Sequence, residues 1–206
     1  MQNAAFAALG LDFRYVALDV PPDQVENTVR GLGALGFAGA NVTAPHKLAV
    51  GALDFVEADV ASVNTLVLED GRIRGYSTDA AILAGLPAER PAILGDGGSA
   101  QAFREALPHA RVFSRRGEWP PDVGDADLVV HATSVRDEVI VELAPGQVLV
   151  DLPYPETATA AAARSAGARV VTGLDVLLAQ GAAAFELWTG RPAPLDAMRA
   201  ALGLSR

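Results

Sequence analysis

Strand-like and helix-like segments alternate along almost the whole chain, and this alternation restarts after Pro91 with a glycine-rich turn. Alternation of this kind is typical of α/β proteins, in which helices cover the faces of a mostly parallel sheet. The second half has the order strand, glycine turn, helix, strand that is typical of a dinucleotide-binding fold. Its expected strands are short apolar runs at 92–94, 111–113, 127–131, 148–152 and 169–171.

The first half predicts a smaller α/β lobe. Residues 1–9 have the composition of a helix that ends at Gly10, and Asp70-Gly71 is a strong signal for a tight hairpin turn. A helix should begin at Pro21-Pro22 and keep one apolar face inward, with Gly36 as its cap. The inward residues are Val25, Val29, Leu32 and Leu35, and the expected strands are Phe13–Val20, Ala38–Thr43, Thr65–Glu69 and Arg72–Tyr76.

The boundary between the two lobes is expected near Leu86–Pro91, a stretch with two prolines. We therefore predict a substrate-binding domain at 1–86 and a Rossmann-like nucleotide-binding domain at 87–182. The remaining residues, 183–206, should form helices that pack back on the first domain. Each lobe is expected to have its own sheet.

Composition excludes several classes of function. The chain has 206 residues, half of them hydrophobic, and its net charge of −9 argues against binding to nucleic acid or to an anionic membrane. It contains no cysteine, and its three histidines are scattered, so no metal site is predicted. Neither a membrane-spanning run nor a signal peptide is evident, and a cytoplasmic monomer or homodimer is expected.

The glycine-rich turn predicts a nucleotide site. Gly95, Gly97 and Gly98, followed by Ser99, lie between a strand and a helix, where glycines let the backbone approach a pyrophosphate. A tight turn between a strand and a helix would need glycines as well. The next strand ends near Ser114, which lies 19 residues after Gly95, and NAD enzymes place an acidic residue at about this position. This chain has Ser114, Arg115 and Arg116 there, and guanidinium groups favour the 2′-phosphate of NADP.

Three polar clusters at strand ends predict the substrate site. They are Asn41-Val-Thr-Ala-Pro-His-Lys47, Asn64-Thr65 and Ser77-Thr78-Asp79. Ligand-binding groups collect at strand ends in α/β proteins. Lysine is the side chain that burial most readily turns into a proton carrier.

These motifs together resemble the shikimate dehydrogenase family, whose patterns read N-V-T-x-P-x-K, A-V-N-T and N-T-D. The resemblance continues in Asp127-Leu-Val-Val-His-Ala-Thr-Ser134, similar to D-L-V-I-N-A-T-S, and in Val150-Asp-Leu-Pro-Tyr-Pro155, similar to D-x-x-Y-x-P. The segment from Gly173 to Gly190 is similar to G-L-x-M-L-x-x-Q-A-x-x-x-F-x-x-W-T-G. In total the likeness covers about residues 3–192.

The resemblance implies an NADP-dependent oxidoreductase that interconverts 3-dehydroshikimate and shikimate, a step of aromatic amino acid biosynthesis. It implies Lys47 as the general acid and base and Asp79 as its partner, although an aspartate there would also stabilise the first turn of a helix. Thr43, Asn64 and Gln180 match positions that bind substrate hydroxyls. The implied cofactor-binding residues are Gly95, Gly97, Gly98, Ser99, Ser114, Arg115, Arg116, Thr133, Tyr154 and Gly173.

The chain departs from the family pattern at three places. The family begins with a strand and the segment S-x-S-x-x-x-H-N, of which only Asn3 has a counterpart, so weak binding of the substrate carboxylate is expected. Ser77 replaces an asparagine, and Val135-Arg136 replaces a glycine-containing turn. Two alternatives stay open: a quinate/shikimate-type dehydrogenase with another substrate or with NAD, and a truncated dinucleotide-binding paralogue without turnover.

Overall fold

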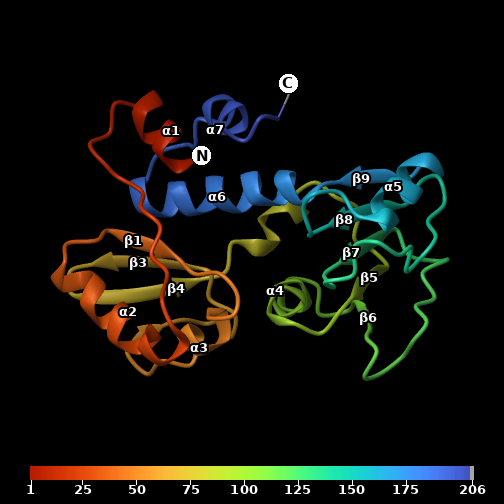
Figure 1. Cartoon of the computed structure of the whole chain (residues 1–206), viewed down its shortest axis with the longest axis horizontal. Helices are drawn as coiled ribbons and strands as arrows, with labels where there is room; N and C mark the ends of the chain where they lie inside the picture. The colour runs from red at the N-terminus through yellow and green to blue at the C-terminus, as the bar shows by residue number, and fades with distance from the viewer. Residues whose placement is uncertain (205–206) are drawn as a thin grey trace. The chain divides into compact units, whose positions relative to one another are not determined.

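The computed structural model describes residues 1–204, which form two compact units with separate sheets (Figure 1). The first unit comprises Met1–Thr78 and the chain from Leu178 onward, and the second comprises Asp79–Leu177. The first boundary thus falls at Thr78, where the sequence suggested residue 86. The reason is that Ile82, Leu83 and Leu86 pack into the apolar core of the second unit. The second boundary falls between Leu177 and Leu178, inside the helix Gly173–Thr189. The sequence suggested residue 182, which lies further along the same helix.

The sheet of the first unit is mixed rather than parallel. Its strands β1 (Gly39–Asn41), β3 (Thr65–Glu69), β4 (Arg72–Tyr76) and β2 (Val56–Glu57) lie in the order β1-β3-β4-β2. The hairpin β3–β4 makes the centre of the sheet antiparallel, and β2 alone runs parallel to β4. Asp70 and Gly71, with φ of 52° and 75°, form the predicted turn.

Phe13–Val20 is not a strand, which corrects the sequence expectation. The segment is extended, but no described residue pairs with it in a ladder. Residues 14–20 and residues 39–46 both line a groove of about 430 Å³. The apolar residues of Phe13–Val20, four of them consecutive at 15–18, satisfy strand propensity. A strand, however, also requires a neighbouring backbone within hydrogen-bonding distance.

The first unit has two apolar clusters, and helices contribute to both. The helix α2 (Val25–Ala34), which follows the short turn η1 (Pro22–Gln24), packs with α3 (Lys47–Gly51) on the sheet. Leu35 does not join this face: it is 75% exposed, because the helix ends at Ala34 and Gly36 turns the chain away at φ 75°. A second cluster joins α1 (Gln2–Ala8), the C-terminal part of α6 (Gly173–Thr189) and α7 (Leu195–Ala201).

The second unit contains a fully parallel sheet of five strands in the order β6-β5-β7-β8-β9. From β5 the chain moves to β6 on one side and then returns to β7 on the other. The switch point therefore lies between β5 and β7, and ligands of such sheets bind outside the carboxyl ends of the strands at that point. The strands are β5 (Pro91–Leu94), β6 (Arg111–Phe113), β7 (Leu128–His131), β8 (Val148–Asp151) and β9 (Arg169–Val171).

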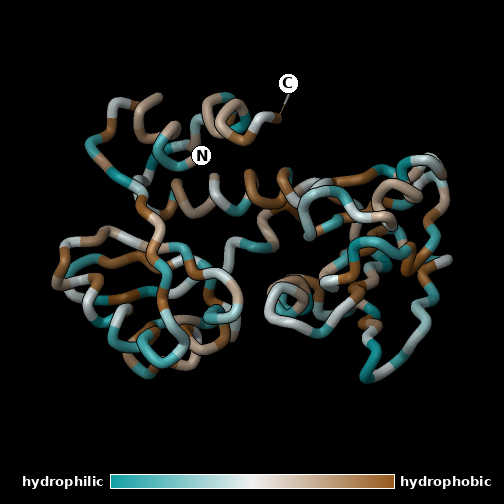
Figure 2. The backbone as a smooth tube through the Cα atoms, viewed as in Figure 1, coloured by the Kyte–Doolittle hydropathy of each residue, from teal (hydrophilic) through white to brown (hydrophobic). Residues whose placement is uncertain are grey.

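Alternate side chains of these strands build two cores, one on each face of the sheet. The helix α4 (Gly98–Ala106) and the turn η2 (Asp79–Leu83) cover one face, and α5 (Ala158–Ser165) covers the other. The connection from β6 to β7 contains no helix. Its Trp119, Val123 and Ala126 pack instead into the core on the face that α5 covers. Figure 2 shows hydrophobic residues along much of α6 as well as along the strands. Among the described residues, no helix is both long and apolar enough to cross a membrane.

Candidate active site

Asn64 is the centre of the polar cluster in the first unit. Its side-chain oxygen Oδ1 accepts hydrogen bonds from the backbone N–H of Thr78 at 2.8 Å and from the hydroxyl of Thr65 at 3.0 Å. Its Nδ2 donates to Oε1 of Gln180 at 3.2 Å. Because Oδ1 faces backbone and hydroxyl donors, the amide orientation is fixed, and Nδ2 is the side-chain atom that can donate toward a ligand. Two sequence-predicted substrate residues, Asn64 and Gln180, are therefore brought together.

Lys47 and Thr43 are held beside this centre through the backbone. The carbonyl of Asn64 accepts from the N–H of Val42 at 2.8 Å, which places Thr43 one residue further along. The carbonyl of Lys47 accepts from the N–H of Val63 at 3.2 Å, and Lys47 is the first residue of α3. The Lys47 side chain is half-buried, and that of Thr43 is exposed.

Asp79 follows Thr78 directly and is the first residue of the 3-10 turn η2. It is 6% exposed, and a carboxylate buried to this extent requires compensating partners. The backbone N–H and the hydroxyl of the preceding Thr78 both bond to Asn64, which fixes where the chain enters this turn. Asp79 thus starts from a well-defined backbone position.

Three residues that the sequence reasoning left without a role complete the cluster in the first unit. Asn41 donates through Nδ2 to the Thr65 hydroxyl at 3.1 Å, and Tyr15 donates its hydroxyl to Asn41 Oδ1 at 3.0 Å. Burial raises the pKa of the Tyr15 phenol, which keeps it a neutral donor. Asn41 and Thr65 lie inside the motifs quoted above, so the motifs pointed to them. Tyr15 gave no signal, because only the fold brings it to β1.

The predicted cofactor residues of the second unit lie along the carboxyl edge of the parallel sheet. Gly95 has φ of 121°, and a Cβ there would lie 2.8 Å from the carbonyl oxygen of Ala132. The glycine turn is thus pressed against the chain that leaves β7 and leads to Thr133. The N–H of Gly95 also donates to the carbonyl of Phe113, the last residue of β6, at 2.8 Å.

The start of α4 fits a phosphate group. Gly97 is the N-cap of this nine-residue helix and makes no side-chain capping bond. A Cβ on Gly97 or on Gly98 would meet no atom within 4 Å, so there is open space over the helix N-terminus. Backbone N–H groups and the helix dipole attract anions at a helix N-terminus. Ser99, the second residue of α4, lies in the same first turn.

The turn after β6 carries the predicted 2′-phosphate residues. Ser114 closes a tight turn by accepting from the N–H of Gly117 at 3.0 Å, and Arg115 and Arg116 are both exposed. Arg116 Nη1 lies 3.8 Å from Oδ2 of Asp96, the acidic residue inside the glycine turn. The Arg115 guanidinium lies 5.9 Å from the centre of the Trp119 ring. Arg116 is therefore partly neutralised by Asp96, whereas Arg115 has an aromatic partner that leaves its charge intact.

Tyr154 and Gly173 occupy the end of the edge beyond β8. Tyr154 is 55% exposed, and Gly173 is buried at the start of α6. A Cβ on Gly173 would come within 2.7 Å of the carbonyl oxygen of Pro153, so only glycine allows this close approach. Thr133 is half-buried and accepts from the N–H of Val135 at 3.1 Å.

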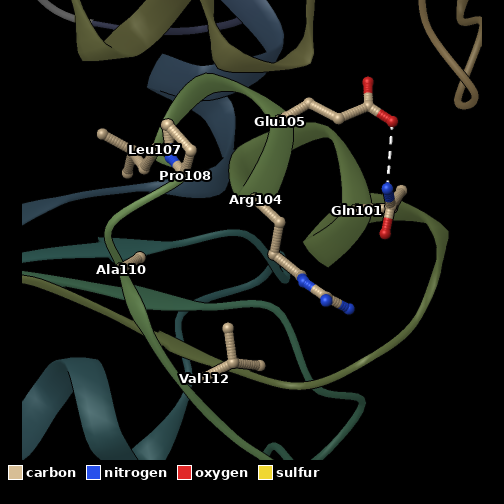
Figure 3. A pocket seen from close by; sticks show the side chains of 7 residues that line it. All are labelled: Gln101, Arg104, Glu105, Leu107, Pro108, Ala110 and Val112. Carbon is tan, nitrogen blue, oxygen red and sulfur yellow. Dashed lines mark hydrogen bonds between the residues drawn. The ribbon is translucent and has the colours of Figure 1, made fainter.

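A separate hollow of about 300 Å³ lies beside α4 and contains none of the predicted site residues (Figure 3). Gln101 Nε2 donates to Oε1 of Glu105 at its rim at 3.0 Å. Among the described residues, no group of three or more histidine and acidic side chains could hold a metal ion.

Comparisons with known proteins agree with this geometry. The family model for the shikimate dehydrogenase substrate binding domain matches residues 1–66, and that for the shikimate 5′-dehydrogenase C-terminal domain matches residues 173–202. The shikimate dehydrogenase (NADP(+)) of Moorella thermoacetica is 40% identical over the whole of this chain and 89% of its own length. The chain belongs to the shikimate dehydrogenase family. A second relative with the same name, from an Anaeromyxobacter species, is 39% identical over 98% of this chain and 89% of its own.

Solved structures place the fold in the same family. A shikimate dehydrogenase crystallised with NADP+ is 29% identical, with a TM-score of 0.86 over all of this chain and 90% of its own. The shikimate dehydrogenase of Thermus thermophilus, in complex with NADP(H) and shikimate, is 29% identical and has a TM-score of 0.84 over 98% of this chain and 92% of its own. These matches confirm the α/β fold with two lobes.

Proposed function

We propose that this protein is an NADP-dependent shikimate dehydrogenase, which reversibly reduces 3-dehydroshikimate to shikimate. Its relatives at 39–40% identity carry that name. The observation that carries the proposal is Lys47, the only lysine among 206 residues, since all other members of the Lys and Arg set are arginines. Arginine stays charged at all accessible pH values, whereas lysine can release its proton. Lys47 is therefore the one amine or guanidinium side chain of this chain able to exchange a proton, and its backbone lies beside Asn64.

Lys47 would act on the ring oxygen that changes between ketone and alcohol. In the reducing direction the ammonium donates a proton to the forming alkoxide, and in the oxidising direction the amine removes it. When bound, NADPH would supply a hydride to the ring carbon that carries this oxygen, and NADP+ would accept it in the oxidising direction. Asp79 would orient the ammonium and accept from the same substrate hydroxyl. Nδ2 of Asn64, Gln180 and the exposed hydroxyl of Thr43 would bind the remaining ring hydroxyls.

The test of this proposal is turnover of the purified chain. We expect oxidation of NADPH on addition of 3-dehydroshikimate, and reduction of NADP+ on addition of shikimate, followed by cofactor absorbance. Quinate with NAD+ is the matched comparison, because it represents the main alternative. A higher kcat/KM for quinate and NAD+ would reject the proposal in favour of that alternative. A chain that binds NADPH without turning over any of these substrates would match a dinucleotide-binding paralogue.

Arg115 is expected to determine the preference for NADPH over NADH. A charge-assisted hydrogen bond contributes about 1.5–3 kcal/mol, so Arg115→Ala should weaken NADPH binding about tenfold or more and leave NADH binding nearly unchanged. Arg116→Ala should weaken it less, because Asp96 lies 3.8 Å from that guanidinium. The measurement is the dissociation constant of each cofactor.

Arg169→Ala is the control for loss of a positive charge, since Arg169 begins β9 at the amino end of the strands. Equal losses of NADPH and NADH affinity in Arg115→Ala would show that this arginine supports the fold rather than the 2′-phosphate. The cytoplasmic location and the monomeric or homodimeric state remain predictions.

A further inference from the structure

A fully buried histidine lies at the carboxyl edge of the nucleotide-binding sheet, and the proposed function gives it no part. His131 is the last residue of β7 and Asp151 the last of β8, and the two are direct partners in the parallel register. They are 0% and 1% exposed. His131 stands where the family pattern quoted above has asparagine.

The ring of His131 joins Asp151 to Thr133. Its Nδ1 lies 2.7 Å from Oδ1 of Asp151, and its Nε2 lies 2.7 Å from the hydroxyl oxygen of Thr133. Asp151 is held in turn by Thr157, which donates its hydroxyl to Oδ1 at 3.1 Å and its backbone N–H to Oδ2 at 3.2 Å. Thr157 is also the N-cap of α5, so the carboxylate has a rigid support.

The hydrogen-bond chemistry of these groups limits where the protons can lie. A carboxylate only accepts hydrogen bonds, so Nδ1 must carry the proton that faces Asp151. In the form with this single ring proton Nε2 is an acceptor, and the Thr133 hydroxyl donates to it. Thr133 already accepts from the N–H of Val135 on one lone pair. Its second lone pair is left for a donor outside this chain of bonds.

We propose that His131 and Asp151 are positioning residues that make Thr133 a hydrogen-bond acceptor for the cofactor. Thr133 adjoins the glycine turn, since the Cβ position of Gly95 lies 3.4 Å from its backbone nitrogen. An acceptor there suits a neutral donor of the dinucleotide, either a carboxamide N–H or a ribose hydroxyl. It does not suit a phosphate oxygen, which itself only accepts. This inference rests on the proposed function insofar as the ligand is NADP(H).

The direct test is the nitrogen NMR spectrum of the histidine rings in the protein without cofactor. The chain has three histidines, and a His131→Asn variant assigns the signal of interest. We expect the His131 proton on Nδ1 and an unprotonated Nε2. A proton on Nε2 in the wild-type protein overturns the proposal, and this measurement needs no variant of Asp151 to fold.

Asp151→Asn tests the consequence. Its amide oxygen should stay toward the N–H of Thr157, so that its NH2 group faces Nδ1 and forces the proton to Nε2. The ring then donates to the Thr133 hydroxyl, which has no lone pair left to accept a hydrogen bond from the cofactor. NADPH affinity should fall about three- to tenfold, the effect of one neutral hydrogen bond, and the NMR signal should report the other tautomer.

A double-mutant cycle separates positioning from a purely structural role. Thr133→Val should lower NADPH affinity by the same factor as Asp151→Asn, and the double variant should be no worse than Thr133→Val alone. Thr133→Ser, which keeps the hydroxyl, should retain wild-type affinity. Multiplied losses in the double variant would overturn the proposal.

A cofactor analogue identifies the donor that Thr133 accepts. With the 3-acetylpyridine analogue of NADPH, which lacks the carboxamide N–H, the Thr133→Val effect should vanish if that N–H is the donor. The effect should persist if a ribose hydroxyl is the donor. Both results support an acceptor role for Thr133. Because binding is measured without turnover, a protein that binds NADPH but reduces no 3-dehydroshikimate would refute the proposed function and leave this inference standing.

Discussion

Replacing Lys47 by alanine should lower kcat for 3-dehydroshikimate reduction by about 10²–10⁴-fold, the usual contribution of a general acid or base. The dissociation constant of NADPH should stay nearly unchanged, because the nucleotide residues belong to other elements. The decisive control is Lys47→Arg, which keeps the positive charge but cannot release a proton at accessible pH. It should be as inactive as Lys47→Ala if proton transfer is the role of Lys47. Near-wild-type kcat in Lys47→Arg would reduce that role to electrostatic binding.

The single lysine also allows a direct measurement of its proton affinity. Isotope-labelled lysine gives one side-chain signal in this chain, since no second lysine is present. Its titration can then be compared with the pH dependence of kcat/KM, which reports essential acids and bases of the free enzyme. Agreement between the two would assign the kinetic step to Lys47. A step in the pH profile that persists in Lys47→Arg would assign it to another group.

Local rules predicted the elements whose geometry is fixed by adjacent residues. The hairpin around Asp70-Gly71 occurs with the predicted strand bounds, because the turn type requires positive φ at those two positions. The expectations for Phe13–Val20 and Leu35 failed because each depends on a partner. A strand needs a neighbouring backbone, and an apolar residue is buried only if the helix continues far enough to bring it over the core.

In the candidate site, too, the features fixed by adjacent residues were predictable and those that depend on distant partners were not. The glycine turn and the arginines after β6 were predicted because strand, turn and helix follow one another in the chain. The hydrogen bonds of Asn64 join residues from 41 to 180, and only the fold assembles them. His131 and Asp151 are 20 residues apart and meet through the register of two parallel strands. No spacing rule in the sequence specifies that register. The sequence pattern therefore assigned His131 no role, although it is one of three scattered histidines and part of the motif at 127–134.

Two glycines of the same turn should respond to alanine in different ways, and the difference tests whether the turn binds a phosphate. Gly95→Ala places a methyl group 2.8 Å from the Ala132 carbonyl oxygen at φ 121°. Backbone strain of this kind costs about 1–3 kcal/mol, so the melting temperature should fall. The same methyl group should displace Ala132 and Thr133, which adjoin the turn. If the whole strain free energy is lost from binding, NADPH affinity should fall about 10–100-fold.

Gly97→Ala has no such strain, because Gly97 is the N-cap of α4 with φ of −80° and has open space above it. The melting temperature should therefore fall less than in Gly95→Ala, because only the N-cap preference for glycine over alanine is lost. The methyl group would instead occupy the space in which a pyrophosphate approaches the backbone, and NADPH affinity should fall by about tenfold, or roughly 1.4 kcal/mol. Calorimetric melting and cofactor titration of the two variants measure both effects. Wild-type affinity in Gly97→Ala would mean that the open space at the start of α4 does not receive the phosphates, and that the glycines serve only the tight turn between β5 and α4.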